Sequence, residues 1–405
     1  MVFVAPLQVP KINPHPDFPA VADTEDGGPL RSPGLLEPAH KFTFESVQGF
    51  FVQTGPKPKH NDFEDLLDKS FGLMDTSPDR WHNLRADVAR LQAEAPAGVH
   101  YKVFFLGRHG QGWHNYGAER YGVESWETYW TCQNGDGNLV WGPDPELTPL
   151  GHKQTRAIYE TWQKERPHGA PINPGEIRWF VSPLQRTCQT MYNSWGEMIS
   201  ATPEIWEDWR EIVGLHTCDK RSTKVSRTRA KPGGASGTMA STIATRFPNI
   251  IIEEGFEEDD LLWFPDQRES DTSMQKRMRR ALDRVFDGAA PETYVSITGH
   301  GAIFRNLLAV LGHQPYPLST GEMIPVVVKA TRVRHSHSHS HSHSHSNGHR
   351  HANGHTNHAN GLKNGHANGH VNGHAHHHSN GFSNGHANGH TNGHANGNGV
   401  PAAKH

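Results

Sequence analysis

Strand-like apolar runs alternate with helical segments from residue 102 to residue 328, and no other feature of the sequence constrains the fold as strongly. Strands that alternate with helices predict an α/β fold whose mostly parallel sheet is covered on both faces. The predicted strands are residues 102–106, 177–181, 204–207, 294–298 and 324–328, of which the last could lie at an edge. The predicted helices are residues 80–95, 149–164, 183–199, 272–286 and 302–311.

Basic and imidazole side chains follow three of these predicted strands. Arg108 and His109 come after the strand at 102–106, Arg186 after the strand at 177–181, and His300 after the strand at 294–298. Open parallel sheets bind ligands beyond the carboxyl ends of their strands, so we expect these four side chains to share one pocket. Each motif alone is weak evidence, and the prediction depends on all three occurring in this order.

The four side chains suit the transfer of a phosphoryl group. The planar fork of arginine matches two phosphate oxygens, which makes Arg108 and Arg186 candidate phosphate ligands. An unprotonated imidazole nitrogen can accept the phosphoryl group and split one displacement into two, and His109 is the candidate nucleophile. We expect His300 to be a further phosphate ligand, protonated as the transferring group gains charge. The sequence therefore predicts a phosphohistidine-forming phosphatase or mutase.

The reaction also needs a proton donor and further ligands for the phosphate oxygens. Glu211 follows the segment 204–207 and is the candidate that protonates the leaving alkoxide and later deprotonates water; the alternative is a surface carboxylate at a strand end. Asn115 and Gln111, just beyond the candidate nucleophile, could bind phosphate oxygens or only shape the turn. Gly301, next to His300, is assigned to substrate binding.

The position of Arg186 carries information of its own. Ser182 and Pro183 predict the start of a helix, with a hydroxyl N-cap followed by proline. Arg186 would then lie in the first turn, where the helix dipole disfavours a cation. This placement suggests an anion nearby, and the alternative is an exposed Arg186 paired with a surface carboxylate.

Composition divides the 405-residue chain into three parts. Residues 1–40 are rich in Pro and Gly and predict an extended arm, and residues 41–334 predict the catalytic domain. Residues 335–405 hold 20 of the 32 histidines among Ser, Asn, Gly and Ala, with almost no apolar surface to bury, which predicts a disordered tail. The tail would bind divalent metal ions adventitiously. We favour a repeat without function over a metal-responsive arm.

Residues 212–262 interrupt the alternation and predict an insertion in the catalytic domain. The insertion contains a basic run between residues 220 and 231 and an acidic run between residues 253 and 260. One interpretation is a solvated surface segment. The other is a lid whose basic half binds an anionic substrate.

Charge and cysteine usage limit the partners and the compartment. None of the 42 acidic residues lies in the tail, and only Arg350, Lys363 and Lys404 of the 39 Lys and Arg do, so the rest of the chain is mildly acidic. This balance argues against nucleic acid as a partner. With three cysteines, no basic leader segment and no apolar run of about 18 residues, we expect a soluble protein of the cytoplasm, and also of the nucleus, that binds no membrane.

Together these motifs resemble the histidine phosphatase superfamily, which has the phosphoglycerate mutase-like fold. The resemblance covers residues 42–330 and includes Leu147-Thr148, Gly151 and Arg210-Glu211 beside the strand-end motifs. Longer matches at residues 49–53, 108–115 and 210–221 are similar to the fungal phosphomutase-like proteins. The resemblance implies a three-layer fold and no metal or cofactor. It also implies these roles: His109 as phosphoacceptor, Arg108, Arg186 and His300 in the pocket, and Glu211 as proton donor.

True glycerate mutases carry a dense substrate-gripping segment after the acid, whereas this chain has residues 216–221 there. We therefore predict a metal-independent phosphatase that hydrolyses a small phosphorylated metabolite through a phosphohistidine on His109. One alternative is a phosphomutase of the same fold. The other is a non-catalytic binding protein with a metal-responsive His-rich tail.

Overall fold

The computed structural model describes residues 40–55, 66–224 and 243–333, all within one compact unit, Met1–His337. The predicted arm, apart from its last residue, and the predicted His-rich tail lie outside the described residues. No helix in the described part of the chain is both long enough and apolar enough to cross a membrane.

Seven strands form a single mixed sheet in the order β1-β7-β2-β6-β3-β4-β5. The strands are β1 (Phe42–Ser46), β2 (Val99–Arg108), β3 (Ile177–Val181), β4 (Glu204–Ile205), β5 (Ile251–Ile252), β6 (Tyr294–Gly299) and β7 (Met323–Arg332). Strands β2, β6, β3, β4 and β5 run parallel, while β7 is antiparallel to both β1 and β2. The predicted α/β fold with a mostly parallel sheet is confirmed.

The placement of β7 at an edge is wrong. This strand lies between β1 and β2, and its residues from Met323 to Val328 are buried without alternation, as expected for a strand covered on both faces. On this side of the sheet the edge strand is β1, which the strand pattern did not predict, and the opposite edge is β5.

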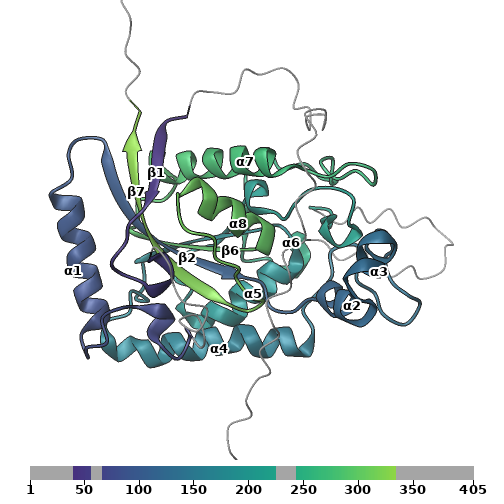
Figure 1. Ribbon diagram of the computed structural model, residues 1–405, viewed down its shortest axis with the longest axis horizontal. Helices are drawn as coiled ribbons and strands as arrows, with labels where there is room; N and C mark the ends of the chain where they lie inside the picture. Colours follow the sequence, from purple (N-terminus) through teal and green to yellow (C-terminus); the bar gives the residue numbers. More distant parts are fainter. Residues whose placement is uncertain (1–39, 56–65, 225–242, 334–405) are drawn as a thin grey trace, which may run out of the picture. The chain divides into compact units, whose positions relative to one another are not determined.

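Helices cover both faces of the sheet and complete the predicted three layers (Figure 1). On one face lie α1 (Arg80–Ala93), α4 (Pro149–Glu165) and α5 (Gln185–Trp195); on the other lie α7 (Asp271–Arg284) and α8 (Gly301–Val310). The shorter helices α2 (Trp113–Tyr121) and α3 (Val123–Thr128) lie beyond these layers. The short helix α6 (Ile243–Arg246) adds Ile243 to the core that α1, α4 and α5 share.

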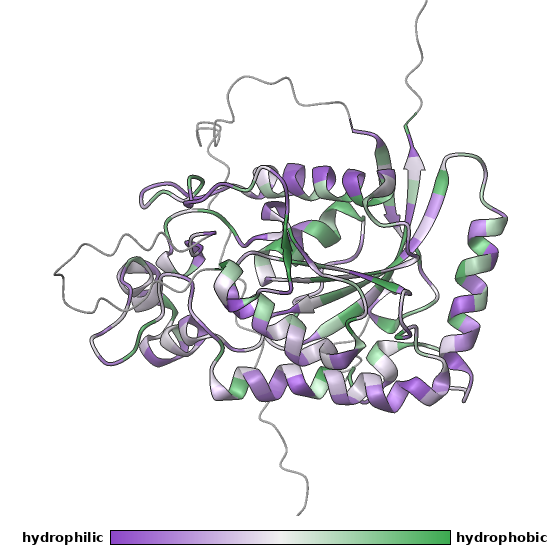
Figure 2. Cartoon of the chain, turned by 180° about the vertical axis from the view of Figure 1, so that it is seen from behind, coloured by the Kyte–Doolittle hydropathy of each residue, from purple (hydrophilic) through white to green (hydrophobic). Residues whose placement is uncertain are grey.

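Alternating side chains of β2 build two separate cores. Phe104 and Leu106 point into the core under α7 and α8. Phe105 points the other way, where its ring centroid lies 5.0 Å from that of Trp162 on α4. Figure 2 shows the consequence, with hydrophobic strands inside and hydrophilic outer faces on α4 and α7. Burial of large aromatic rings on both sides contributes several kcal/mol, at about 1.5–3 kcal/mol for each such side chain, and fixes the strand between its helices.

Helix α5 begins later than the Ser182-Pro183 signal predicts. Its N-cap is Leu184 and its first helical residue is Gln185. Ser182 thus lies two residues before the N-cap, and its hydroxyl is 2.7 Å from Nε2 of His300. Arg186 still lies in the first turn of the helix, as predicted.

Two glycines let the loop after β2 lie directly on the start of α4. A Cβ added to Gly110 would lie 2.4 Å from the carbonyl oxygen of Gly151, and a Cβ added to Gly151 would lie 2.2 Å from that of Gln111. The Thr148 hydroxyl caps α4 by accepting the Gly151 N–H at 3.1 Å. The loop after His109 is therefore positioned by backbone contact with α4.

We expect Gly151→Ala to destabilise the protein by about 1–3 kcal/mol, because the new methyl group must push the loop off the helix. The free energy of unfolding from urea titration measures the loss. Gly55→Ala is the matched control, since its Cβ would meet the nearest atom at 3.4 Å, an ordinary contact. Equal stability of the two variants would contradict the prediction.

Candidate active site

The imidazole of His109 is held at the carboxyl end of β2 and is 1% exposed. Its backbone N–H donates to the Gly299 carbonyl at 3.0 Å, and its own carbonyl accepts the Gly321 N–H at 2.9 Å. Nδ1 lies 2.7 Å from the Gly110 carbonyl oxygen. A carbonyl only accepts, so Nδ1 carries the proton and Nε2 has none when the ring is neutral. Burial, together with the positive charges of Arg186 and Arg108, lowers the pKa of His109 well below its ordinary value.

His300 follows β6 and faces His109, with ring centroids 5.1 Å apart. The parallel register sets Arg108 opposite Gly299, which brings the residues after both strands together. Nε2 of His300 is 2.7 Å from the Ser182 hydroxyl, while its Nδ1 is buried with no hydrogen-bond partner among the described residues. Burial, then the charge of Arg186, lowers the pKa of His300 well below its ordinary value.

Arg108 approaches the start of α8 closely. Its Nη1 donates to the Leu318 carbonyl. A Cβ added to Gly301 would lie 3.1 Å from the guanidinium carbon of Arg108. Gly301, predicted for substrate binding, thus makes room for the guanidinium beside His300.

Arg186 is 1% exposed and forms a buried ion pair. Its Nη2 donates to Oδ1 of Asp219 at 2.9 Å, and its Nη1 donates to the Cys218 carbonyl at 2.8 Å. The side chain of Asp219 is 5% exposed. The anion expected near this residue is therefore present but belongs to the protein, and the surface pair considered as the alternative is wrong.

Helix α5 ties Arg186 to the His109 loop. The Gly110 N–H donates to the Thr190 hydroxyl at 3.1 Å, and that hydroxyl donates to the Arg186 carbonyl at 2.8 Å. The four strand-end side chains are thus brought to one place by backbone and side-chain contacts.

Glu211 is half-buried beside these cations. Its Oε1 accepts the Ile212 N–H at 2.9 Å. Burial, then the negative charge of Asp219, raises the pKa of Glu211 above its ordinary value, although Arg186 and Arg108 oppose the change. Arg277 of α7 fixes the backbone here by donating from Nη1 to the carbonyls of Asp208 and Arg210 at 3.0 and 2.8 Å. A carboxyl that retains its proton more readily than usual suits a proton donor.

The comparisons with known proteins decide the family. A profile of the histidine phosphatase superfamily (branch 1) matches residues 105–235. A probable phosphoglycerate mutase of Arthroderma benhamiae is 31% identical over 318 residues, which are 74% of this chain and 88% of that protein. The chain belongs to the histidine phosphatase superfamily. It is therefore an enzyme of the class that contains phosphatases and mutases.

Other relatives are similar over comparable lengths. Phosphomutase-like protein 3 of Candida albicans is 33% identical over 285 residues, covering 70% of this chain and 79% of that protein. Among solved structures, mycobacterial hydrolase 1 covers 56% of this chain and 91% of its own, with 18% identity and a TM-score of 0.32. A phosphoserine phosphatase mutant of Entamoeba histolytica in complex with phosphoserine covers 55% and 89%, with 18% identity and a TM-score of 0.30.

The two residues predicted to bind phosphate oxygens, Gln111 and Asn115, form hydrogen bonds with other groups of the protein. The Gln111 side chain donates to both carboxylate oxygens of Glu119 at 3.2 and 3.1 Å and accepts from the Thr148 hydroxyl at 2.7 Å. Oδ1 of Asn115 accepts the Gly112 N–H at 2.9 Å. These contacts favour the turn-shaping alternative for Gln111, whereas the amide nitrogen of Asn115 stays a candidate ligand.

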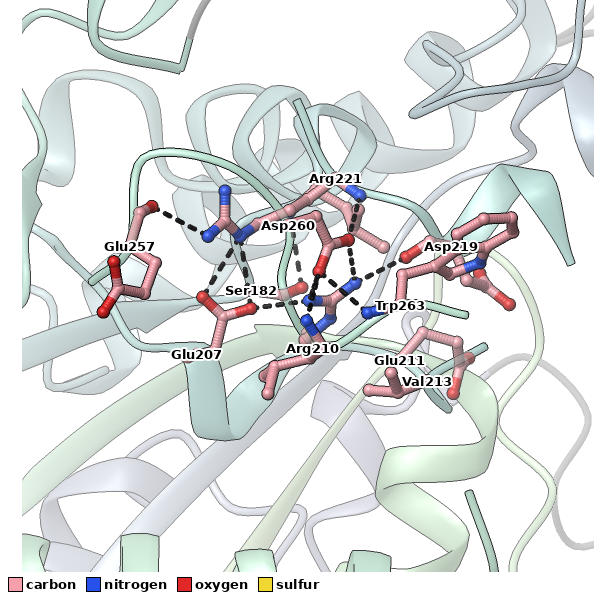
Figure 3. A network of polar contacts seen from close by, with 12 residues as sticks. Ser182, Glu207, Arg210, Glu211, Val213, Asp219, Arg221, Glu257, Asp260 and Trp263 are labelled. Carbon is pink, nitrogen blue, oxygen red and sulfur yellow. Dashed lines mark hydrogen bonds and ion pairs between the residues drawn. The ribbon is translucent and has the colours of Figure 1, made fainter. Parts of the chain in front are cut away.

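The described part of the insertion folds back on itself through a buried ionic network (Figure 3). Arg210 donates to both carboxylate oxygens of Asp260 at 2.8 and 2.7 Å, to Glu207 at 2.7 Å and to the Asp219 carbonyl at 2.8 Å. Nη2 of Arg221 donates to the carbonyls of residues 257 and 259 at 2.8 and 3.0 Å. The acidic run thus binds the start of the basic run.

The two described lysines of the basic run also contact the insertion itself or the residue that follows it. Nζ of Lys220 lies 4.8 Å from the centroid of the Trp263 ring, and Nζ of Lys224 donates to the Phe256 carbonyl at 3.4 Å. Arg227, Arg229 and Lys231 lie outside the described residues. The lid stays a prediction.

The sequence analysis missed two residues of the candidate active site. Asp219 pairs with Arg186, and the ring centroid of His114 lies 5.3 Å from that of His109. His114 lies five residues after His109, and that short spacing was the available signal, although the sequence analysis predicted no helix over residues 113–121. One group in the described part of the chain has the residue types of a metal site, namely His216, Cys218 and Asp219. Their ligand atoms lie within 4.8 Å of one another, but Asp219 already binds Arg186.

We expect Asp260→Ala to cost about 3–5 kcal/mol, because it leaves the fully buried guanidinium of Arg210 without its two-pronged partner. Denaturant unfolding followed by tryptophan fluorescence measures the loss. Asp259→Ala removes a neighbouring exposed carboxylate and keeps the carbonyl that binds Arg221, so we expect a change within about 0.5 kcal/mol. Similar losses in both variants would refute the assignment of the energy to Asp260.

Proposed function

We propose that the protein is a metal-independent phosphatase that hydrolyses a small phosphorylated metabolite through a phosphohistidine on His109. One observation carries the proposal: a buried imidazole with an unprotonated Nε2 lies beside a second imidazole and two guanidiniums at the carboxyl ends of three strands. This arrangement combines a nucleophile with preorganised positive charge, which are the two requirements of phosphoryl transfer.

The chemistry needs two displacements at phosphorus. Nε2 of His109 attacks, the ester P–O bond breaks, and Glu211 gives its proton to the leaving alkoxide. The Glu211 carboxylate then takes a proton from water, the hydroxide attacks phosphorus, and the P–N bond breaks to release inorganic phosphate. Arg108, Arg186 and His300 stabilise the negative charge in both steps. An arriving phosphate dianion raises the pKa of His300 again and supplies an acceptor for its buried Nδ1.

The contacts of the basic side chains that follow Glu211 in the sequence favour hydrolysis over glycerate mutase activity. A glycerate carboxylate needs a cationic partner beside the phosphate pocket. Arg221 instead binds Glu207 and backbone carbonyls, and Lys220 lies over Trp263. The relatives named as mutases keep the alternative open. If labelled oxygen from water enters the released phosphate at every turnover, the enzyme is a hydrolase; transfer to a second acceptor without label would identify a mutase.

The cytoplasm, and with it the nucleus, is the proposed site of action. All three cysteines are free, and two of them, Cys188 and Cys218, are buried. Unpaired buried thiols are typical of proteins in a reducing compartment, which supports this part of the proposal.

We expect His109→Ala to lower the turnover of p-nitrophenyl phosphate by about a thousandfold or more, because no other group replaces the nucleophile. Acid-quenched wild-type enzyme should carry labelled phosphate and the variant none. His82→Ala, an exposed histidine on α1, is the control and should keep full activity. Chelators should not inhibit the wild type, and vanadate should. Undiminished turnover in His109→Ala would overturn the proposal.

Glu211→Gln should slow phosphorylation by about a hundredfold or more for an alkyl phosphate and far less for p-nitrophenyl phosphate, whose leaving group needs little protonation. The raised pKa of Glu211 sets the sign of the pH dependence: the wild-type rate falls as pH rises through that pKa, since the acid loses its proton. This fall should disappear in Glu211→Gln. Pre-steady-state rates across pH with both substrates test this, and equal losses for both substrates would exclude the acid role.

A further inference from the structure

A third imidazole lies beside His109. His114 is the second residue of α2, and its ring centroid is 5.3 Å from that of His109, almost the same as the 5.1 Å that separates His109 from His300. The rings of His114 and His300 therefore both contact the candidate nucleophile. The two proposed displacement steps assign no role to His114.

Gly112 makes room for this ring. A Cβ added to Gly112 would lie 2.7 Å from both Cε1 and Nδ1 of His114, and the next atom, the Glu146 carbonyl oxygen, is at an ordinary 3.4 Å. The Gly112 backbone has φ −92° and ψ 166°, a conformation that any residue adopts. The glycine is thus required by the imidazole and not by the turn. The ring is folded back over the start of α2, on the side where His109 lies.

The ring of His114 has the electrostatic surroundings of the phosphate pocket. Burial, then the charges of Arg186, His109 and Arg108, lowers its pKa well below the ordinary value. Its Nδ1 is buried with no hydrogen-bond partner among the described residues. An unsatisfied buried nitrogen costs about 1–3 kcal/mol, and an oxyanion among these cations would supply the missing partner.

We propose that His114 is a further residue of the phosphate pocket, which donates a hydrogen bond to an oxygen of the bound phosphoryl group. The proposal rests on the function proposed above, since it takes the ligand to be a phosphate ester. An anion that reaches His109 also reaches His114, because the two rings are in contact and share both guanidiniums. The added donor would hold the phosphoryl group between the imidazoles of His114 and His300.

Gly112 provides a test that moves the ring without changing its chemistry. In Gly112→Ala the new methyl group displaces the His114 ring, whereas in the background of His114→Ala it meets nothing closer than 3.4 Å. The probe is orthovanadate, titrated into the wild type, each single variant and the double variant, with intrinsic tryptophan fluorescence as the readout. Melting temperatures of all four proteins check folding.

We expect each single variant to bind orthovanadate about tenfold or more weakly, the loss of one hydrogen bond to a charged group. The double variant should bind no more weakly than His114→Ala, because the two changes remove the same contact. A fifth protein, His114→Asn, retains a side-chain donor and should bind orthovanadate more tightly than His114→Ala. A merely structural His114 would lower the melting temperature and leave vanadate affinity unchanged.

Two results would overturn the proposal. One is His114→Ala binding orthovanadate within twofold of the wild type. The other is additive losses in the double variant, which would show that Gly112 acts through the helix start alone. Failure of the phosphatase proposal would look different from failure of the His114 proposal: the wild type would bind orthovanadate but hydrolyse no phosphate ester. In that case the orthovanadate affinities of the variants would still decide the role of His114.

Discussion

Parallel pairing among β2, β6 and β3 is the constraint on which the pocket depends. The register sets Arg108 opposite Gly299 and Val181 opposite Thr298, so the residues that follow all three strands start from neighbouring positions. The backbone N–H of His109 also donates a hydrogen bond to the carbonyl of Gly299, at the end of β6. An imidazole fixed by backbone hydrogen bonds needs little reorganisation before it reacts. The pocket is therefore a consequence of sheet topology first and of side-chain choice second.

The charges around this pocket set protonation states that suit an incoming dianion. Burial and two guanidiniums keep the His109 and His300 rings neutral, while burial and Asp219 help Glu211 to retain its proton. Asp219 acts in two ways, since the same carboxylate binds Arg186. One buried anion thus orients a cation of the pocket and raises the pKa of the candidate acid.

Features with a local signal could be predicted from the sequence, and features that depend on tertiary contact could not. Strand ends and their motifs placed His109 and His300 correctly. Asp219 lies 33 residues beyond Arg186, outside every predicted helix and strand, and only the folded backbone selects it as the partner. The short strand β1 has two buried phenylalanines but no flanking alternation, and missing it moved β7 to the edge.

The insertion supplies buried carboxylates next to the pocket. Arg210, which precedes Glu211, donates to the Asp219 carbonyl and to Asp260, so one guanidinium joins the candidate acid, the partner of Arg186 and the acidic run. A buried guanidinium without its carboxylates would be an uncompensated charge, and these segments can be buried only together. Arg210 therefore links the backbone at Asp219 to that of its own chain neighbour Glu211. Electrostatic stabilisation of a transition state requires charges that are fixed in advance, and this network of buried hydrogen bonds holds them in place.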